Sequence, residues 1–123
     1  MNLLNKGVQK ALPPLYSQEK TLDPIVTVKF FAPVGAATWY ITEGSPVDEN
    51  GDFVHGENGE KVDYDSKKHA DFLFFGLCDL GYGGELGYVS LTELKSVRLP
   101  FGLGIERDLH FTPAPLSEFM RGQ

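Results

Sequence analysis

Apolar positions near the start of the chain have a helical spacing. Val8, Ala11 and Leu12 fall on one face of a helix, and Asn5 precedes them as an N-cap. The proline pair that follows ends the helix, because proline has no N–H and restricts the residue before it.

Five later runs have the composition or the alternation of β-strands. The first is rich in β-branched and aromatic residues and places Val26, Val28 and Phe30 on one face. The third is apolar on both faces, which predicts a strand that is covered on both sides and lies centrally in its sheet. Short turns follow the first and the third run, so each is expected to form an antiparallel hairpin with its successor. The five runs are residues 25–31, 38–42, 71–78, 85–89 and 105–111.

A capping box predicts a second helix from about residue 91 to residue 97. The Ser90 oxygen would accept a hydrogen bond from the backbone N–H of Glu93, whose carboxylate reaches back to the start of the helix. Val89 and Leu94 occupy the positions of the hydrophobic contact that accompanies this motif. The order of elements therefore predicts a single α+β domain over residues 1–123, with a mainly antiparallel sheet and two short helices.

Residues 44–70 interrupt this pattern with a segment rich in glycine and acidic residues. Asn50-Gly51 and Asn58-Gly59 are typical turn dipeptides, because both central residues of a type I′ turn need a positive φ. Short strands are expected at 53–55 and 61–64, around the second turn. The segment is therefore interpreted as an extruded acidic hairpin inserted into the domain.

The charge of the chain is concentrated in this region. The 123 residues carry a net charge of −6. Residues 43–65 hold eight acids and one base, a net −7, and the remaining nine acids and ten lysines or arginines give +1. Direct nucleic-acid binding is disfavoured, because phosphate recognition needs a basic patch. The acids taken as candidate partner contacts are Asp48, Glu49, Asp52, Glu57, Glu60 and Asp63.

The sequence also favours a cytoplasmic protein. Its apolar stretches are shorter than a membrane span, and the N-terminal residues lack the apolar core of a secretory signal. The one cysteine, Cys78, cannot form an internal disulfide, which fits a reducing compartment. Because Cys78 lies in an apolar strand, packing is favoured over a role as nucleophile.

The histidines have no ligand spacing in the sequence. His55, His69 and His110 are far apart, and the loop that begins at Asp48 departs from a calcium-binding loop because Gly59 stands where the closing glutamate belongs. We therefore expect no metal ion and no cofactor.

Carboxylates offer a catalytic interpretation and a structural one. Glu85 begins a strand beside the glycine turn that should expose Tyr82, and Glu106 lies next to Arg107. Two carboxylates act as acid and base when their surroundings separate their pKa values. Structurally, Arg107 falls on the apolar face of its strand and needs a buried partner, which Glu85 or Glu93 would supply. The structural interpretation is favoured.

Six motifs stand out together: Leu12-Pro-Pro-Leu-Tyr16, Val28-Lys-Phe-Phe31, Trp39-Tyr40, Phe75-Gly-Leu77, Glu85-Leu-Gly-Tyr-x-Ser-Leu-x-Glu-Leu94 and Gly104-Ile-Glu-Arg-Asp-Leu-x-Phe111. They resemble a family of small bacterial proteins catalogued only as a domain of unknown function and often encoded on plasmids, phages and conjugative elements. The resemblance covers nearly the whole chain except residues 44–70. It implies a mobile-element setting, in which small accessory proteins often counter restriction or CRISPR defences. It supplies no activity and no catalytic residues.

Two functions follow as hypotheses. The first is a non-enzymatic binding protein, an anti-restriction or anti-CRISPR inhibitor that occludes a nucleic-acid-handling partner through its acidic surface, with Tyr82 and Glu85 as further contacts. The second is a small enzyme or ligand-binding domain that uses Glu85, Glu106 and Tyr82 in a cleft.

Overall fold

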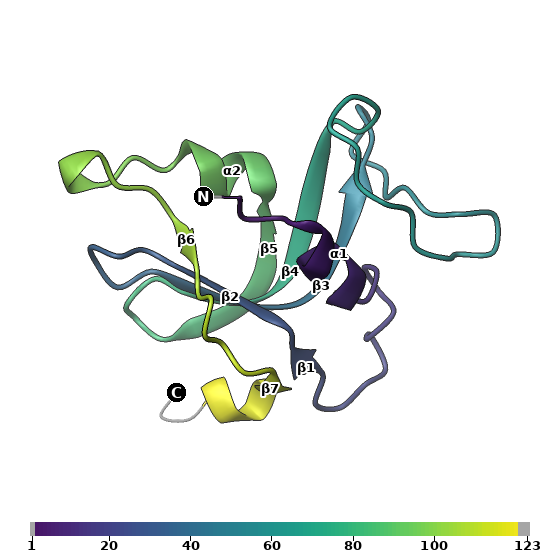
Figure 1. Ribbon diagram of the computed structural model, residues 1–123. Helices are drawn as coiled ribbons and strands as arrows, with labels where there is room; N and C mark the ends of the chain where they lie inside the picture. Colours follow the sequence, from purple (N-terminus) through teal and green to yellow (C-terminus); the bar gives the residue numbers. More distant parts are fainter. Residues whose placement is uncertain (1, 121–123) are drawn as a thin grey trace.

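A five-stranded antiparallel sheet organises the chain in the computed structural model, which describes residues 2–120 (Figure 1). The strand order is β5-β4-β3-β2-β6, and β1 pairs with β7 in a separate two-stranded sheet. The predicted α+β fold, with a mainly antiparallel sheet and two short helices, is confirmed. The elements are α1 (Lys6–Ala11), β1 (Ile25–Val26), β2 (Val28–Phe31), β3 (Thr38–Val47), β4 (Asp71–Asp79), β5 (Gly84–Ser90), α2 (Leu91–Ser96), η1 (Pro100–Gly102), β6 (Glu106–Arg107), β7 (Ala114–Pro115) and η2 (Leu116–Phe119).

Both helices begin at the predicted caps. The Asn5 side chain accepts a hydrogen bond from the Val8 N–H at 2.8 Å. Ser90 Oγ accepts one from the Glu93 N–H at 3.0 Å, and Glu93 Oε1 accepts one from the Ser90 N–H at 3.1 Å. Within residues 2–120, neither helix nor any other is long and apolar enough to cross a membrane.

Removing the second cap should weaken the fold measurably. Ser90→Ala leaves the Glu93 N–H without its acceptor, so the free energy of unfolding is expected to fall by about 1 kcal/mol. Urea denaturation checks this value, with the exposed neighbour Thr92→Ala as control. Equal losses in the two variants would contradict the role of the cap.

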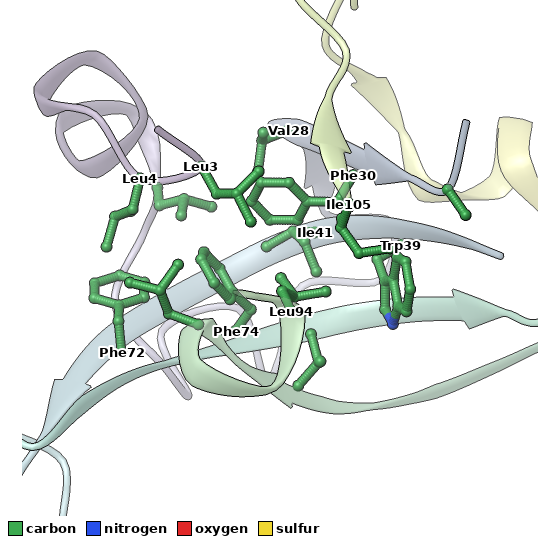
Figure 2. Packing of buried hydrophobic residues seen from close by; sticks show 14 residues of the cluster. Leu3, Leu4, Val28, Phe30, Trp39, Ile41, Phe72, Phe74, Leu94 and Ile105 are labelled. Carbon is green, nitrogen blue, oxygen red and sulfur yellow. The ribbon is translucent and has the colours of Figure 1, made fainter. Parts of the chain in front are cut away.

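The main core lies on one face of the large sheet. Phe30 and Phe74 meet there edge to face, with ring centroids 5.1 Å apart, and Leu94 from α2 packs into the same cluster. Leu3 and Leu4, which precede α1, are buried in the same cluster (Figure 2). Neither leucine is predicted from the sequence to be buried, because both lie outside any periodic run.

The other face of the sheet carries a smaller apolar cluster. Val26, Leu77 and Leu116 are buried together, and Tyr40 stacks on Phe119 with ring centroids 4.5 Å apart. The interior strand β4 is therefore covered on both faces, as predicted: the main core covers Phe72 and Phe74, and the smaller cluster covers Leu77 on the other face. The middle strand of the sheet is nevertheless β3.

Strand β3 is longer than predicted and continues to Val47. Residues 43–47 are buried, although residues 44–47 were assigned to the inserted acidic segment. Proline is tolerated here because β2 pairs with β3 only as far as Ile41, so one side of the later stretch is a sheet edge. The pairing of β3 with β4 shifts register between Ile41 and Glu43, which makes Thr42 the extra residue of a β-bulge.

The inserted segment is not the predicted hairpin. Both Asn-Gly pairs lie in turns, and Gly51 and Gly59 adopt φ values of 82° and 78°, but neither Asn50 nor Asn58 has a positive φ, so the turns are not of the predicted type I′. The expected strands at 53–55 and 61–64 are absent from the described residues, where Val47 and Phe53 form an isolated bridge. The chain instead forms an irregular loop that extends beyond the end of the sheet (Figure 1). Its polar groups form hydrogen bonds within the turns and with α1, so they are satisfied without pairing between strands.

The last predicted strand is also shorter than expected. Only Glu106 and Arg107 pair with β2, and Leu109 is exposed beyond them. Arg107 pairs with Phe30 and so lies on the core face of the sheet, as predicted. It is half-buried rather than buried, and its guanidinium donates a 2.6 Å hydrogen bond to the backbone carbonyl of Asn2.

Arg107 is thus placed to hold the N-terminal segment on the core. We expect Arg107→Ala to lower the free energy of unfolding by about 1–2 kcal/mol, because it removes a charge-assisted hydrogen bond beside Leu3. Thermal melts compared with the exposed Lys20→Ala test this expectation. An unchanged melting temperature would mean that the contact with Asn2 contributes nothing.

Candidate functional site

The acidic loop, defined as residues 48–65, presents most of its carboxylates to solvent. Asp48 and Asp65 are half-buried, and Glu43 does not belong to the loop because it is only 5% exposed on β3. The charge of the protruding surface is therefore smaller than the sequence count suggested, since one of the eight acids lies inside. The exposed acids are Glu49, Asp52, Glu57, Glu60 and Asp63.

Two carboxylates of the loop accept hydrogen bonds from its own turns. Asp48 Oδ1 accepts the N–H groups of Asn50 and Asp52 at 2.9 and 3.0 Å, and Glu60 Oε2 accepts that of Asn58 at 2.9 Å. These bonds fix the turn conformations locally, as Asx-type turns do. A neutral amide in place of either carboxylate would keep an oxygen acceptor.

The loop is attached to the body through α1 and the core. Lys61 Nζ donates to the carbonyls of Gln9 and Lys10, at 2.5 and 2.9 Å, where the last turn of α1 leaves carbonyls without helical partners. Burial lowers the pKa of Lys61, against the opposing effect of Asp63. Tyr64 packs edge to face on the core residue Phe72, with ring centroids 5.9 Å apart. The one lysine of the loop is thus used as an anchor.

Tyr82 and Glu85 lie away from the acidic loop. Tyr82 is 96% exposed in the β4–β5 turn, and Glu85 is exposed at the start of β5. The acidic loop precedes β4 and this turn follows it. The nine residues of β4 separate the two by roughly 25 Å. The structure therefore divides the candidate partner contacts into two groups at opposite ends of one strand.

The proposed carboxylate pair is not assembled either. Glu85 on β5 and Glu106 on β6 occupy opposite edges of the five-stranded sheet. Glu93, the other possible partner of Arg107, accepts the Ser90 N–H in the capping box. Ser90 and Glu93 are thus placed as structural residues.

Metal-binding residues do not gather within the described part of the chain. No group of three or more His, Cys, Asp or Glu side chains among residues 2–120 is arranged to hold a metal ion. Cys78 is half-buried, and burial, together with the charge of Glu93, raises the pKa of its thiol. The neutral thiol is the form that suits a packing role.

A groove on the second face of the sheet was missed by the sequence analysis. Its volume is about 540 Å³, and the buried Glu43 lies in it. Glu43 pairs across the sheet with Phe75, and Phe75 pairs with Tyr88, so the three side chains stand side by side on one face. Glu43 Oε2 accepts the Gln18 N–H at 2.6 Å, which holds the segment after α1 over the groove.

Tyrosines form the rim of this groove. Tyr88 tilts against Phe75, with ring centroids 4.9 Å apart, and a hydrogen bond with Tyr16 raises the pKa of Tyr88 to about 12, with further contributions from burial and from the charge of Glu43. Tyr16 also contacts Phe53 of the acidic loop, with ring centroids 5.1 Å apart. The groove and the loop are therefore adjacent.

These features define a small α+β protein that presents an acidic loop beside an aromatic groove. A sequence model of one family, described as protein of unknown function (DUF2958), matches residues 3–58 and 64–122, and the chain belongs to this family. The unmatched stretch, 59–63, is much narrower than the 44–70 interval expected to depart from the family, and it lies within the acidic loop. No curated protein and no solved structure matches the chain.

Proposed function

We propose that the protein is a non-enzymatic binding protein that covers a basic surface of a protein partner with its acidic loop. The observation that carries this proposal is the exposure of Glu49, Asp52, Glu57, Glu60 and Asp63 on one protruding loop, whose only lysine is engaged with α1. Charge complementarity of this kind steers diffusional encounter and raises the association rate.

The partner we propose is a cytoplasmic nuclease or CRISPR effector. Enzymes that handle nucleic acids present basic grooves to phosphates, and such a groove would attract a loop of exposed carboxylates. A mobile-element setting, implied by the family resemblance, would make the protein an anti-restriction or anti-CRISPR inhibitor. We do not propose direct binding to nucleic acid, because the carboxylates of the acidic loop would repel its phosphates.

The alternative is a small enzyme or ligand-binding domain that uses Glu85, Glu106 and Tyr82. These three residues would have to share a cleft. Their positions, with the two glutamates on opposite sheet edges, give this alternative less support.

A five-fold amide variant of the loop tests the proposed function. Replacing Asp48, Glu49, Asp52, Glu57 and Glu60 with Asn or Gln should change the free energy of unfolding by about 1 kcal/mol or less, because the amides keep the acceptor oxygens of the turns. Affinity capture from extract of the host cell, with wild type and variant side by side, should recover the partner with the wild type alone. Equal recovery of the same partner by both proteins would exclude the acidic loop as the recognition surface.

A further inference from the structure

We propose that the groove around Glu43 binds an arginine side chain that the partner protein inserts into it. The Glu43 carboxylate would be the counter-ion and the neighbouring aromatic rings the walls. The identity of the occupant rests on the proposed function. The chemistry of the groove does not rest on the proposed function.

The charge of the groove calls for a cation. Glu43 is nearly fully buried, and the hydrogen bond that the structure gives it comes from the neutral backbone N–H of Gln18. The second charged residue of the lining is Glu19, and no lysine or arginine of the described chain lines the groove. A buried carboxylate without a counter-charge is costly, so a cation placed against Glu43 gains more there than at a solvated surface.

The walls of the groove favour a guanidinium over an ammonium group. Phe75, Tyr88 and Tyr16 offer aromatic rings, and the exposed side chains of Leu22 and Leu86 offer apolar surface for an aliphatic stem. A guanidinium group is planar, stacks on aromatic faces and pairs with a carboxylate through two hydrogen bonds. It is also more weakly hydrated than an ammonium group and so enters a desolvated site at lower cost.

The position of the groove connects it to the acidic loop. Tyr16 lines the groove, and its ring packs against Phe53 of the loop. A basic partner that docks on the loop therefore has the mouth of the groove within its footprint. The volume of about 540 Å³ lies in the range of pockets that bind specific ligands and exceeds the needs of one side chain.

Glu43 also has a structural role, because it holds the Gln18 N–H, and the test must separate this role from the binding of a cation. Glu43→Gln keeps an oxygen that can accept the Gln18 N–H and removes the charge. A purely structural glutamate would therefore be replaced without loss of binding. Leu86→Lys, on the exposed wall, is a second variant that places a positive charge in the groove without touching Glu43.

The experiment uses N-acetyl-arginine methylamide as the probe and follows backbone amide NMR shifts of the full chain. We expect saturable shifts at Gln18, Phe75 and Tyr88. The neutral isostere N-acetyl-citrulline methylamide should not produce them, and Glu43→Gln and Leu86→Lys should each weaken probe binding by about tenfold or more. Equal binding of the two probes, or unchanged binding by both variants, would overturn the proposal.

Two controls separate this proposal from the proposed function. The five-fold amide variant of the loop should bind the arginine probe within about twofold of wild type, because it keeps Glu43 and the walls intact. Partner capture by the folded Glu43→Gln variant should weaken in parallel with its probe binding. A variant that loses the probe and keeps the partner would contradict an arginine of the partner as the occupant, and the role of the acidic loop would stand.

Discussion

Gly76→Ala is expected to destabilise the fold by about 3 kcal/mol or more, the largest effect that we expect from a methyl group added at any glycine within residues 2–120. A Cβ atom at this position would overlap the carbonyl oxygen of Tyr40 and lie 2.8 Å from the Cα of Ile41. Both obstacles are backbone atoms of β3, immediately before the bulge at Thr42. They cannot move without breaking the pairing of β3 with β4.

Gly87→Ala is the matched control for this prediction. Gly87 lies directly opposite Gly76 on β5, and a Cβ there meets nothing within 4 Å. We expect a change in the free energy of unfolding of about 0.5 kcal/mol or less. Urea denaturation of the two variants measures the difference, and similar stabilities would show that β3 does not approach β4 as closely as described.

Phe74→Ala is the second variant with a large expected effect. Phe74 is 0% exposed and contacts the rings of Phe30 and Phe72, with centroids 5.1 and 4.9 Å away. Its removal leaves a cavity between the sheet, α2 and the N-terminal segment. The expected loss is about 4 kcal/mol, the sum of lost transfer free energy and cavity cost.

Phe101→Ala is the control for this cavity. Phe101 is 91% exposed, so its truncation should change stability by about 0.5 kcal/mol or less. Thermal denaturation compares the two variants. A loss below about 1 kcal/mol for Phe74→Ala would contradict its place at the centre of the core.

Elements with strong local signals were predictable from the sequence. The capping box at Ser90 places the start of α2, and the two apolar faces of residues 71–78 mark β4 as an interior strand. These signals depend on neighbours in the sequence, so no knowledge of the tertiary structure is needed to interpret them.

Elements that depend on long-range contacts were not predictable in the same way. Gly44 resembles a turn residue, yet a Cβ there would overlap the ring of Phe72, so glycine permits the close approach of β3 to that ring. Leu3 and Leu4 have no periodicity of their own, and they are buried because the chain folds back onto the core.

The candidate sites also differ in whether local sequence signals or long-range contacts form them. Exposure of the loop carboxylates follows from their density and from the Asn-Gly turns, and Tyr82 is exposed as its glycine turn predicts. The groove was not predictable from the sequence, because the bulge at Thr42 changes the face of the sheet on which the Glu43 side chain lies. Its cover, the segment around Gln18, comes from a distant part of the chain.

The association rate with the captured partner, measured at low and moderate salt, tests whether the acidic loop is the recognition surface. Glu57→Gln in the loop and Glu118→Gln in η2 each remove one exposed glutamate charge and form a matched pair beside the five-fold amide variant. We expect slower association for Glu57→Gln, a flattened salt dependence for the five-fold variant, and no change in either quantity for Glu118→Gln. Rates and salt dependence that are the same in all three variants and the wild type would contradict recognition through the acidic loop.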